Sequence, residues 1–154
     1  MVKRSLLSQA AMDGDADTVA ALCRREPECM DKHDDGWTAL HTAIIRGKTE
    51  VIRALITNGA DPDVENRYGV APIFSAVGTH RIHEIVRLLV EDGQCNLLKM
   101  NGAGQTPVEE AKEKGCGAET IALLEAKYKE QFDEREREKA EKAAKKKEQA
   151  AKRA

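Results

Sequence analysis

The chain has 154 residues, enough for one domain of ordinary size and an extension. Aromatic residues make up 3% of it, too few to fill the core of a β-sandwich or β-barrel, so the packing must come from Leu, Ile, Val and Ala, as stacked helices allow. The net charge of -2 is uneven: residues 126–154 carry eleven Lys or Arg and seven Asp or Glu, a net of +4, so residues 1–125 carry -6. An acidic module joined to a basic extension argues against nucleic acid as the main partner of the first 125 residues.

The first two predicted helices span residues 6–12 and 16–25. The hydroxyl of Ser5 can cap the first helix, and the Asp-Gly-Asp sequence at 13–15 makes the turn between the two. Pro27 ends the second helix. The outward face of this pair is small and partly polar, which is typical of the end unit of a stack.

Residues 35–67 predict a second helix pair. Thr38 can cap a helix over 39–44, and Gly47 breaks that helix. The next helix has apolar residues at a spacing of 3.6: Val51, Ile52, Leu55 and Ile56. Neither helix can cover its apolar face alone, so the pattern requires neighbouring units.

The same pattern returns along the chain. Two later glycines hold the place of Gly36: Gly69, 33 residues on, and Gly104, a further 35. The Thr-Ala-Leu-His sequence at 38–41 becomes Ala-Pro-Ile-Phe at 71–74 and Thr-Pro-Val-Glu at 106–109. A period near 33 with these residues in register resembles the ankyrin repeat. The resemblance covers about Ser5 to Leu124, roughly four repeats, and implies an all-α solenoid of helix-turn-helix-loop units.

The third and fourth repeats depart from this pattern in their loops. In the third, the turn over 78–83 is one residue longer than its counterpart, and the exit over 93–98 lacks the Ala-Asp-Pro found at 60–62. The fourth has a short first helix over 108–112 and a second helix from about Ala118. We expect the loops to differ and the helices to be kept, since the apolar stripes persist.

The end of the chain predicts a long charged helix. Residues 133–154 consist almost wholly of Glu, Lys, Arg, Ala and Gln, which favour helices, with acid-before-base pairs four residues apart. No apolar heptad is present, so a self-associating coiled coil is not expected. The sequence thus predicts an ankyrin-repeat domain over 1–125 and a charged helical tail over 126–154, continuous with the last repeat helix.

No pattern indicates a cofactor, a metal or an enzyme. The acidic run at 13–17 lacks the Gly and Glu that an EF-hand would need at Thr18 and Arg24, and the glycines at 102–104 lack the Gly-Lys-Ser/Thr of a P-loop. His80 and His83 have no third ligand nearby. The resemblance assigns His41 a structural role, bonding the backbone of a neighbouring loop.

The four cysteines form no CxxC pair and no zinc spacing with histidine: Cys23, Cys29, Cys95 and Cys116. Cys23 lies on an apolar stripe, so we expect it in the core. With no signal sequence before Ser5 and no apolar run of membrane-spanning length, we expect a reduced, intracellular and cytoplasmic protein. A cytoskeletal or ciliary scaffold is one setting that fits, and the nucleus stays open.

The resemblance places partner contacts beside each turn glycine and near the end of each first helix. The positions carried over as the partner-binding site are Asp34, Asp35, Trp37, Ile45, Arg46, Arg67, Tyr68, Val70 and Gln105. Further positions on the same face are Met12, Asp13, Gly78, Thr79, Gly102, Ala103, Glu113 and Lys114. Trp, Tyr and Arg dominate binding hot spots, which favours a partner at Trp37. The alternative is that Trp37 packs across to Tyr68 within the molecule.

The expected function is a non-catalytic protein–protein interaction module, an adaptor or structural subunit of a larger intracellular assembly. The alternative is an electrostatic binder of nucleic acid or an acidic protein surface, acting through the tail. Its contacts would be Lys145, Lys146, Lys147, Lys152 and Arg153. The sequence leaves open the partner's identity, and whether the tail is an attachment arm or a free solvated helix.

Overall fold

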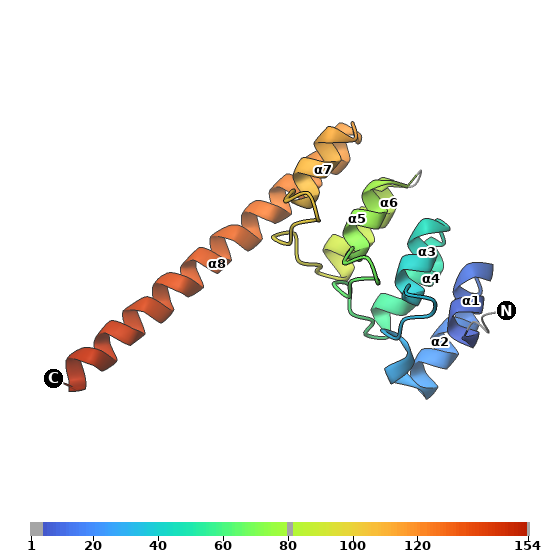
Figure 1. The fold of residues 1–154 in the computed structure, drawn as a ribbon, viewed down its shortest axis with the longest axis horizontal. Helices are drawn as coiled ribbons and strands as arrows, with labels where there is room; N and C mark the ends of the chain where they lie inside the picture. The colour runs from blue at the N-terminus through green and yellow to red at the C-terminus, as the bar shows by residue number, and fades with distance from the viewer. Residues whose placement is uncertain (1–4, 80–81, 154) are drawn as a thin grey trace.

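The computed structural model describes residues 5–79 and 82–153, without the side chain of Arg153. In this part of the chain the regular elements are all helical: α1 (Leu6–Asp13), α2 (Ala16–Arg25), η1 (Pro27–Cys29), α3 (Ala39–Ile45), α4 (Thr49–Thr57), α5 (Pro72–Val77), α6 (Ile82–Arg87), η2 (Leu88–Asp92), α7 (Pro107–Glu113) and α8 (Ala118–Arg153). Successive helix pairs stack side by side, and α8 continues far beyond the stack (Figure 1). The predicted all-α solenoid with a long terminal helix is therefore confirmed.

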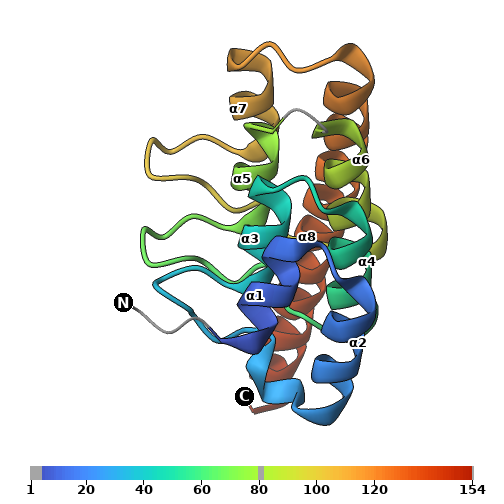
Figure 2. The same ribbon diagram turned by 90° about the vertical axis from the view of Figure 1, so that its right-hand side faces the viewer.

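The stack has two layers. The first helices of the pairs form one layer and the second helices form the other, while the loops between pairs project from the first layer (Figure 2). The helix starts follow the predicted caps: Ser5 accepts a hydrogen bond from the Ser8 amide, and Thr38 accepts one from the His41 amide. These side chains satisfy backbone donors that the first helical turn leaves without partners.

The core lies between the layers and between neighbouring pairs. The predicted stripe residues Val51, Ile52 and Leu55 are fully buried, and Ile56 is half-buried against the core. Cys23 is buried as expected, at 1% exposure. Side chains from adjacent pairs share this core, so each pair depends on its neighbours for burial of its apolar face.

The third pair ends differently from the second. The Leu55 carbonyl accepts from the amide of Ala60, five residues on, whereas the Leu89 carbonyl accepts from Cys95, six residues on. The additional residue is accommodated in η2, a π-helical turn in which the Gly93 amide donates to the Leu88 carbonyl at 2.9 Å. The structure confirms that the third repeat differs from the second at this exit, and the difference is the π-helical turn.

Hydrogen bonds also link the exits of successive pairs. The Asp31 carboxylate accepts from the Asp61 amide at 2.9 Å, and the Asp63 carboxylate accepts from the Asn96 amide at 2.8 Å. In the last pair Gln131 takes this role from α8. Its Oε1 accepts from the Leu97 amide at 2.9 Å, and its Nε2 donates to the Cys95 carbonyl at 2.8 Å.

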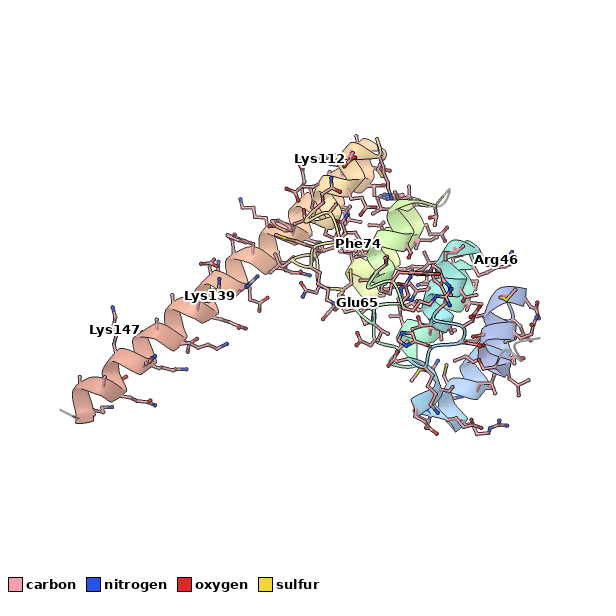
Figure 3. The ribbon with its side chains drawn as sticks, viewed as in Figure 1. Arg46, Glu65, Phe74, Lys112, Lys139 and Lys147 are labelled. Carbon is pink, nitrogen blue, oxygen red and sulfur yellow. The ribbon has the colours of Figure 1, made fainter. Side chains whose placement is uncertain are left out.

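Helix α8 belongs partly to the stack and partly to the tail. Leu124 is fully buried, Tyr128 packs against the core, and Phe132 stacks on Tyr128 with ring centroids 6.2 Å apart. From residue 133 to 152 every side chain is exposed, and Figure 3 shows Lys139 and Lys147 standing out from the projecting helix. The helix runs without a break across residues 125 and 126, so the domain boundary placed there stays a prediction. No described helix is both long and apolar enough to cross a membrane.

Candidate functional site

The loop before α3 is a tight hairpin that positions Trp37. The Asp34 amide donates to the Trp37 carbonyl at 2.8 Å, and the Trp37 amide donates back at 3.2 Å. Asp35 and Gly36 turn the chain with φ values of 54° and 83°. A Cβ at Gly36 would lie 2.1 Å from the Cδ of Arg67, so a side chain is excluded by close approach as well as by conformation. The loops of the second and third repeats are therefore in direct contact at Gly36.

Trp37 is the centre of an aromatic cluster that spans two repeats. Its ring centroid lies 5.8 Å from that of Tyr68 and 5.9 Å from that of His41, both in edge-on geometry. The guanidinium of Arg67 lies 4.8 Å from the Tyr68 ring centroid, donates to its hydroxyl at 2.6 Å and pairs with Asp35 at 3.4 Å. The predicted packing of Trp37 against Tyr68 within the molecule is thus confirmed. Tyr68 is nevertheless 61% exposed, so the cluster still presents an aromatic surface to solvent.

His41 has the structural role that the resemblance implied. It is fully buried, with Nε2 2.8 Å from the Val70 carbonyl oxygen and Nδ1 2.8 Å from the Thr38 hydroxyl oxygen. Burial lowers the pKa of His41, which favours the neutral ring that donates to Val70 and accepts from Thr38. All its hydrogen-bonding capacity is used within the fold.

Beside the aromatic cluster, a cavity of about 190 Å³ opens between the hairpin and helices α1 and α3; we call it the tip groove. Six of the predicted contact positions line it: Met12, Asp34, Asp35, Trp37, Ile45 and Arg46. Two lining residues were not predicted, Ser8 and Thr42. They lie four residues before Met12 and Arg46, so helical periodicity would have placed them on the same face.

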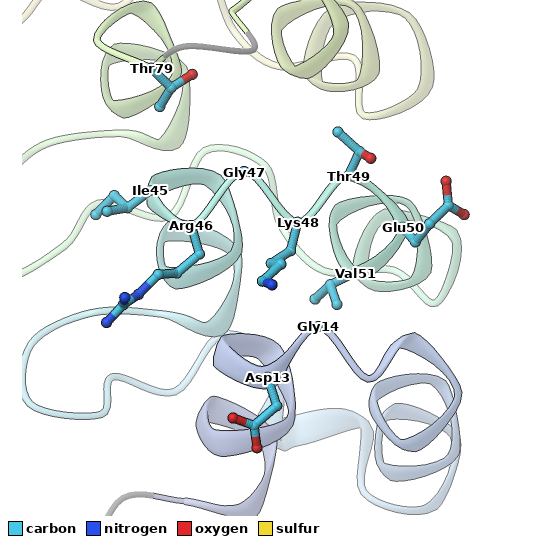
Figure 4. Close-up of a pocket in the computed structure, with 10 residues that line it drawn as sticks. All are labelled: Asp13, Gly14, Ile45, Arg46, Gly47, Lys48, Thr49, Glu50, Val51 and Thr79. Carbon is cyan, nitrogen blue, oxygen red and sulfur yellow. The ribbon is translucent and has the colours of Figure 1, made fainter.

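A second cavity, of about 510 Å³, lies where the turns between the helices of the first two repeats meet; we call it the turn cavity (Figure 4). It shares Ile45 and Arg46 with the tip groove, so the two form one continuous surface. Ile45 is 52% exposed at this junction. Lys48 and Thr49 also line the turn cavity and were not predicted, because the resemblance places contacts only beside the turn glycines and near the ends of the first helices.

The remaining predicted contact positions lie further along the stack. Val70 is half-buried, and its carbonyl is committed to His41. Gln105, in the fourth repeat, donates its side-chain amide to Glu113. The structure therefore gathers the contacts of the first three repeats around the tip groove and the aromatic cluster, and leaves Gln105 apart.

In the tail, two of the lysines predicted to contact a partner also form the predicted ion pairs with glutamates four residues earlier. Lys145 pairs with Glu141 at 2.7 Å and Lys152 pairs with Glu148 at 2.5 Å, whereas Lys146 and Lys147 are exposed without an ion pair to any described residue. The side chain of Arg153 lies outside the described residues. The basic end thus keeps unpaired charge, and its role as a contact surface stays a prediction.

The described part of the chain contains no group of three His, Cys, Asp or Glu side chains that could hold a metal ion, and His80 lies outside it. The acidic run at 13–17 is the turn into α2, where Asp15 caps the helix. Burial raises the pKa of Cys23 to about 11 and that of Cys95 to about 12, so both thiols stay protonated at neutral pH.

Stacked helix pairs with an open groove along their loops define a solenoid built for contact with other proteins. The chain belongs to the ankyrin-repeat family: the family model for ankyrin repeats, in three copies, matches residues 7–101. The fourth helix pair, α7 with α8, extends beyond the match and packs on the third in the same manner. Ankyrin repeats in general form a non-catalytic fold for protein–protein interaction, so the chain carries an interaction module.

Several relatives align with these repeats. Protein phosphatase 1 regulatory subunit 12A of Mus musculus is 37% identical over 78 residues, which are 51% of this chain and 7% of that protein. BCL-6 corepressor-like protein 1 of Homo sapiens is 33% identical over 99 residues, 64% of this chain and 6% of that protein. Protein phosphatase 1 regulatory subunit 27 of Mus musculus is 33% identical over 66 residues, 43% of each chain. The alignments thus span a small part of the first two relatives and less than half of the third.

Proposed function

We propose that the chain is a non-catalytic adaptor or structural subunit of a larger intracellular assembly, and that it binds a partner protein along the tip groove and the aromatic cluster. The observation that carries the proposal is the Trp37–Tyr68 pair, which joins two repeats and leaves Tyr68 61% exposed beside an exposed Ile45. Exposed aromatic and aliphatic side chains next to a groove are typical of binding hot spots. Two of the relatives named above are called regulatory subunits, which supports a subunit role.

The tail completes this proposal as an attachment arm. Helix α8 leaves the stack after Phe132, and at about 1.5 Å per residue its last 21 residues extend roughly 30 Å. Such an arm suits the docking of a compact binding head onto a large scaffold in the cytoplasm, of which a cytoskeletal or ciliary structure is an example. The proposal assigns the partner to the groove and the scaffold to the tail.

A second candidate function rests on the basic end of the tail. Lys146 and Lys147 lack ion pairs among the described residues, so this end could bind nucleic acid or an acidic protein surface. Binding of that kind would weaken steeply with added salt and would be lost when both lysines are replaced by Gln. Groove binding would persist when both lysines are replaced.

The proposal is tested by capturing the partner from the source cell and measuring its affinity for the purified chain. The double variant Trp37→Ala, Tyr68→Ala should weaken binding by about 2 kcal/mol or more. Met100→Ala is a matched control, because Met100 is 65% exposed and does not line the groove. Unchanged affinity in the double variant, with its fold intact by circular dichroism, would rule out the groove as the binding site.

A further inference from the structure

The turn cavity is lined by two cations, Arg46 and Lys48, and by two carboxylates, Asp13 and Glu50. The side chains of Arg46 and Lys48 form no hydrogen bond or ion pair with any described residue. In Figure 4 both side chains extend toward the first repeat. Lys48 lies over Gly14, where a Cβ would come within 3.3 Å of its Nζ, so the absence of a side chain at Gly14 gives the ammonium its place.

The two carboxylates that line the cavity form no ion pair with these two cations. Asp13 accepts two hydrogen bonds from the Gln9 amide, each at 3.1 Å, and its carboxylate is directed away from Lys48 (Figure 4). Glu50 also points away from Lys48 in the same view. At the other end of the continuous surface, Asp34 accepts a hydrogen bond from the Ser5 amide at 2.6 Å, and Asp35 is paired with Arg67. The positive charge of Arg46 and Lys48 is therefore open to an outside anion.

Two further features of the cavity favour a negative group. Helix α4 begins here without a side-chain cap, and the backbone N–H groups of Glu50 and Val51 have no acceptor among the described residues. Thr49 lines the cavity at 8% exposure, and its hydroxyl also lacks a partner among the described residues. Figure 4 shows its side chain projecting on the side of Thr79, which lines the same cavity. The backbone donors at the start of α4 thus lie next to Lys48 in the chain, and the Thr49 hydroxyl lies on the opposite side of the turn from the two cations.

We propose that the turn cavity receives an acidic side chain, Asp or Glu, from the protein segment that occupies the tip groove. The two sites share Ile45 and Arg46, so one extended segment can place an apolar side chain on Ile45 and a neighbouring carboxylate between Arg46 and Lys48. Charge-assisted hydrogen bonds to a carboxylate are directional, so the cavity fixes the position of the segment along the groove. This inference rests on the proposed function and adds the chemistry of the partner: an apolar residue followed by an acidic one.

The test uses the full chain, labelled with ¹⁵N, and two capped pentapeptides that carry Ala-Leu-Glu-Glu-Ala or Ala-Leu-Gln-Gln-Ala. The Glu peptide should shift the amide signals of Thr49, Glu50 and Val51 in a saturable manner, and the Gln peptide should not. The double variant Arg46→Gln, Lys48→Gln should lower affinity for the Glu peptide about fivefold to tenfold. Lys129→Gln is the control, since Lys129 is an exposed cation on α8 without an ion pair to a described residue.

Equal shifts with both peptides, no shifts at residues 49–51, or unchanged affinity in the double variant would overturn the inference. Its failure is distinguishable from failure of the proposed function. One distinguishing result is a partner whose binding is lost in the variant Trp37→Ala, Tyr68→Ala and keeps full affinity in the variant Arg46→Gln, Lys48→Gln. That result would support the groove as the binding site and rule out the acidic contact. The opposite result is specific binding of the Glu peptide at residues 49–51 together with a partner whose affinity is unchanged by Trp37→Ala, Tyr68→Ala. It would support the carboxylate site and rule out the groove as the partner's binding site.

Discussion

The imidazole of His41, in α3, bonds the Val70 carbonyl in the loop of the next repeat, with 2.8 Å between Nε2 and the oxygen. The Nδ1 atom of the same ring is hydrogen-bonded to the Thr38 hydroxyl, also at 2.8 Å. One buried side chain therefore ties the start of its own helix to the neighbouring loop. Because Trp37 packs on this ring, the position of the aromatic cluster depends on the same bond.

The His41 bond should make folding pH-dependent. Burial lowers the pKa of His41 in the folded chain below its ordinary value of 6.5, so the unfolded chain binds the proton more readily. This stabilisation is fully present above pH 6.5 and is lost as the pH falls toward the folded pKa. The urea midpoint should drop between about pH 7 and pH 5, a trend that His41→Gln should flatten. An identical pH profile for His41→Gln and the parent chain would contradict this account.

Stability should be concentrated in the stripes between repeats. Leu55 and Leu89 are fully buried, so Leu55→Ala or Leu89→Ala should lower the free energy of unfolding by roughly 2–5 kcal/mol. Leu6→Ala is the matched control, because Leu6 is 72% exposed and should cost about 0.5 kcal/mol or less. Hydrogen exchange should speed up in the adjacent repeats as well, and a response confined to the mutated helix would contradict the coupling between repeats.

The extent of the folded module can be measured by two truncations. Deleting residues 133–154 removes only exposed side chains among those described, so the free energy of unfolding should stay within about 0.5 kcal/mol. Deleting residues 126–154 also removes Tyr128 and both hydrogen bonds of Gln131, so it should cost about 2 kcal/mol or more. Equal stability of the two truncated chains would support a domain boundary at residue 125.

The shorter truncation also tests the tail as an attachment arm. Loss of residues 133–154 should abolish incorporation into the assembly in cells while groove binding of the partner persists. Normal incorporation of the truncated chain would rule out the arm.

The π-turn at the end of the third repeat predicts an unusual stabilising substitution. Gln94 has a φ of 53°, and it stands directly before Cys95 as Gly59, with a φ of 95°, stands before Ala60. Gln94→Gly should therefore raise the free energy of unfolding by about 0.5–1 kcal/mol, and Gly59→Ala should lower it by about 1 kcal/mol. Gly93→Ala should also be destabilising, because its Cβ would lie 2.8 Å from the Leu89 carbonyl oxygen. A loss of stability in Gln94→Gly, measured by thermal unfolding, would contradict the strain assigned to this residue.

The repeats, the helices and most of the core follow from the amino-acid sequence. Ser5, Thr38 and the stripe through Leu55 act through local rules, capping and a 3.6-residue period, which depend on neighbours a few residues away. The gathering of residues around Trp37 on one surface also follows from the sequence, because a repeat carries each position to a known place, and their contact with a partner stays a prediction. The long final helix followed from composition alone.

Several contacts that join one repeat to the next are visible in the folded structure and were not predicted. The sequence places a glycine at 93, yet the left-handed residue is Gln94, because the packing of Cys95 into the core fixes where the additional residue must be absorbed. It gave no sign that Gln131 would close the last loop, or that Lys48 would lie over Gly14 from the preceding repeat. Such contacts join residues about 34 positions apart, and their geometry depends on how the repeats stack rather than on any local pattern.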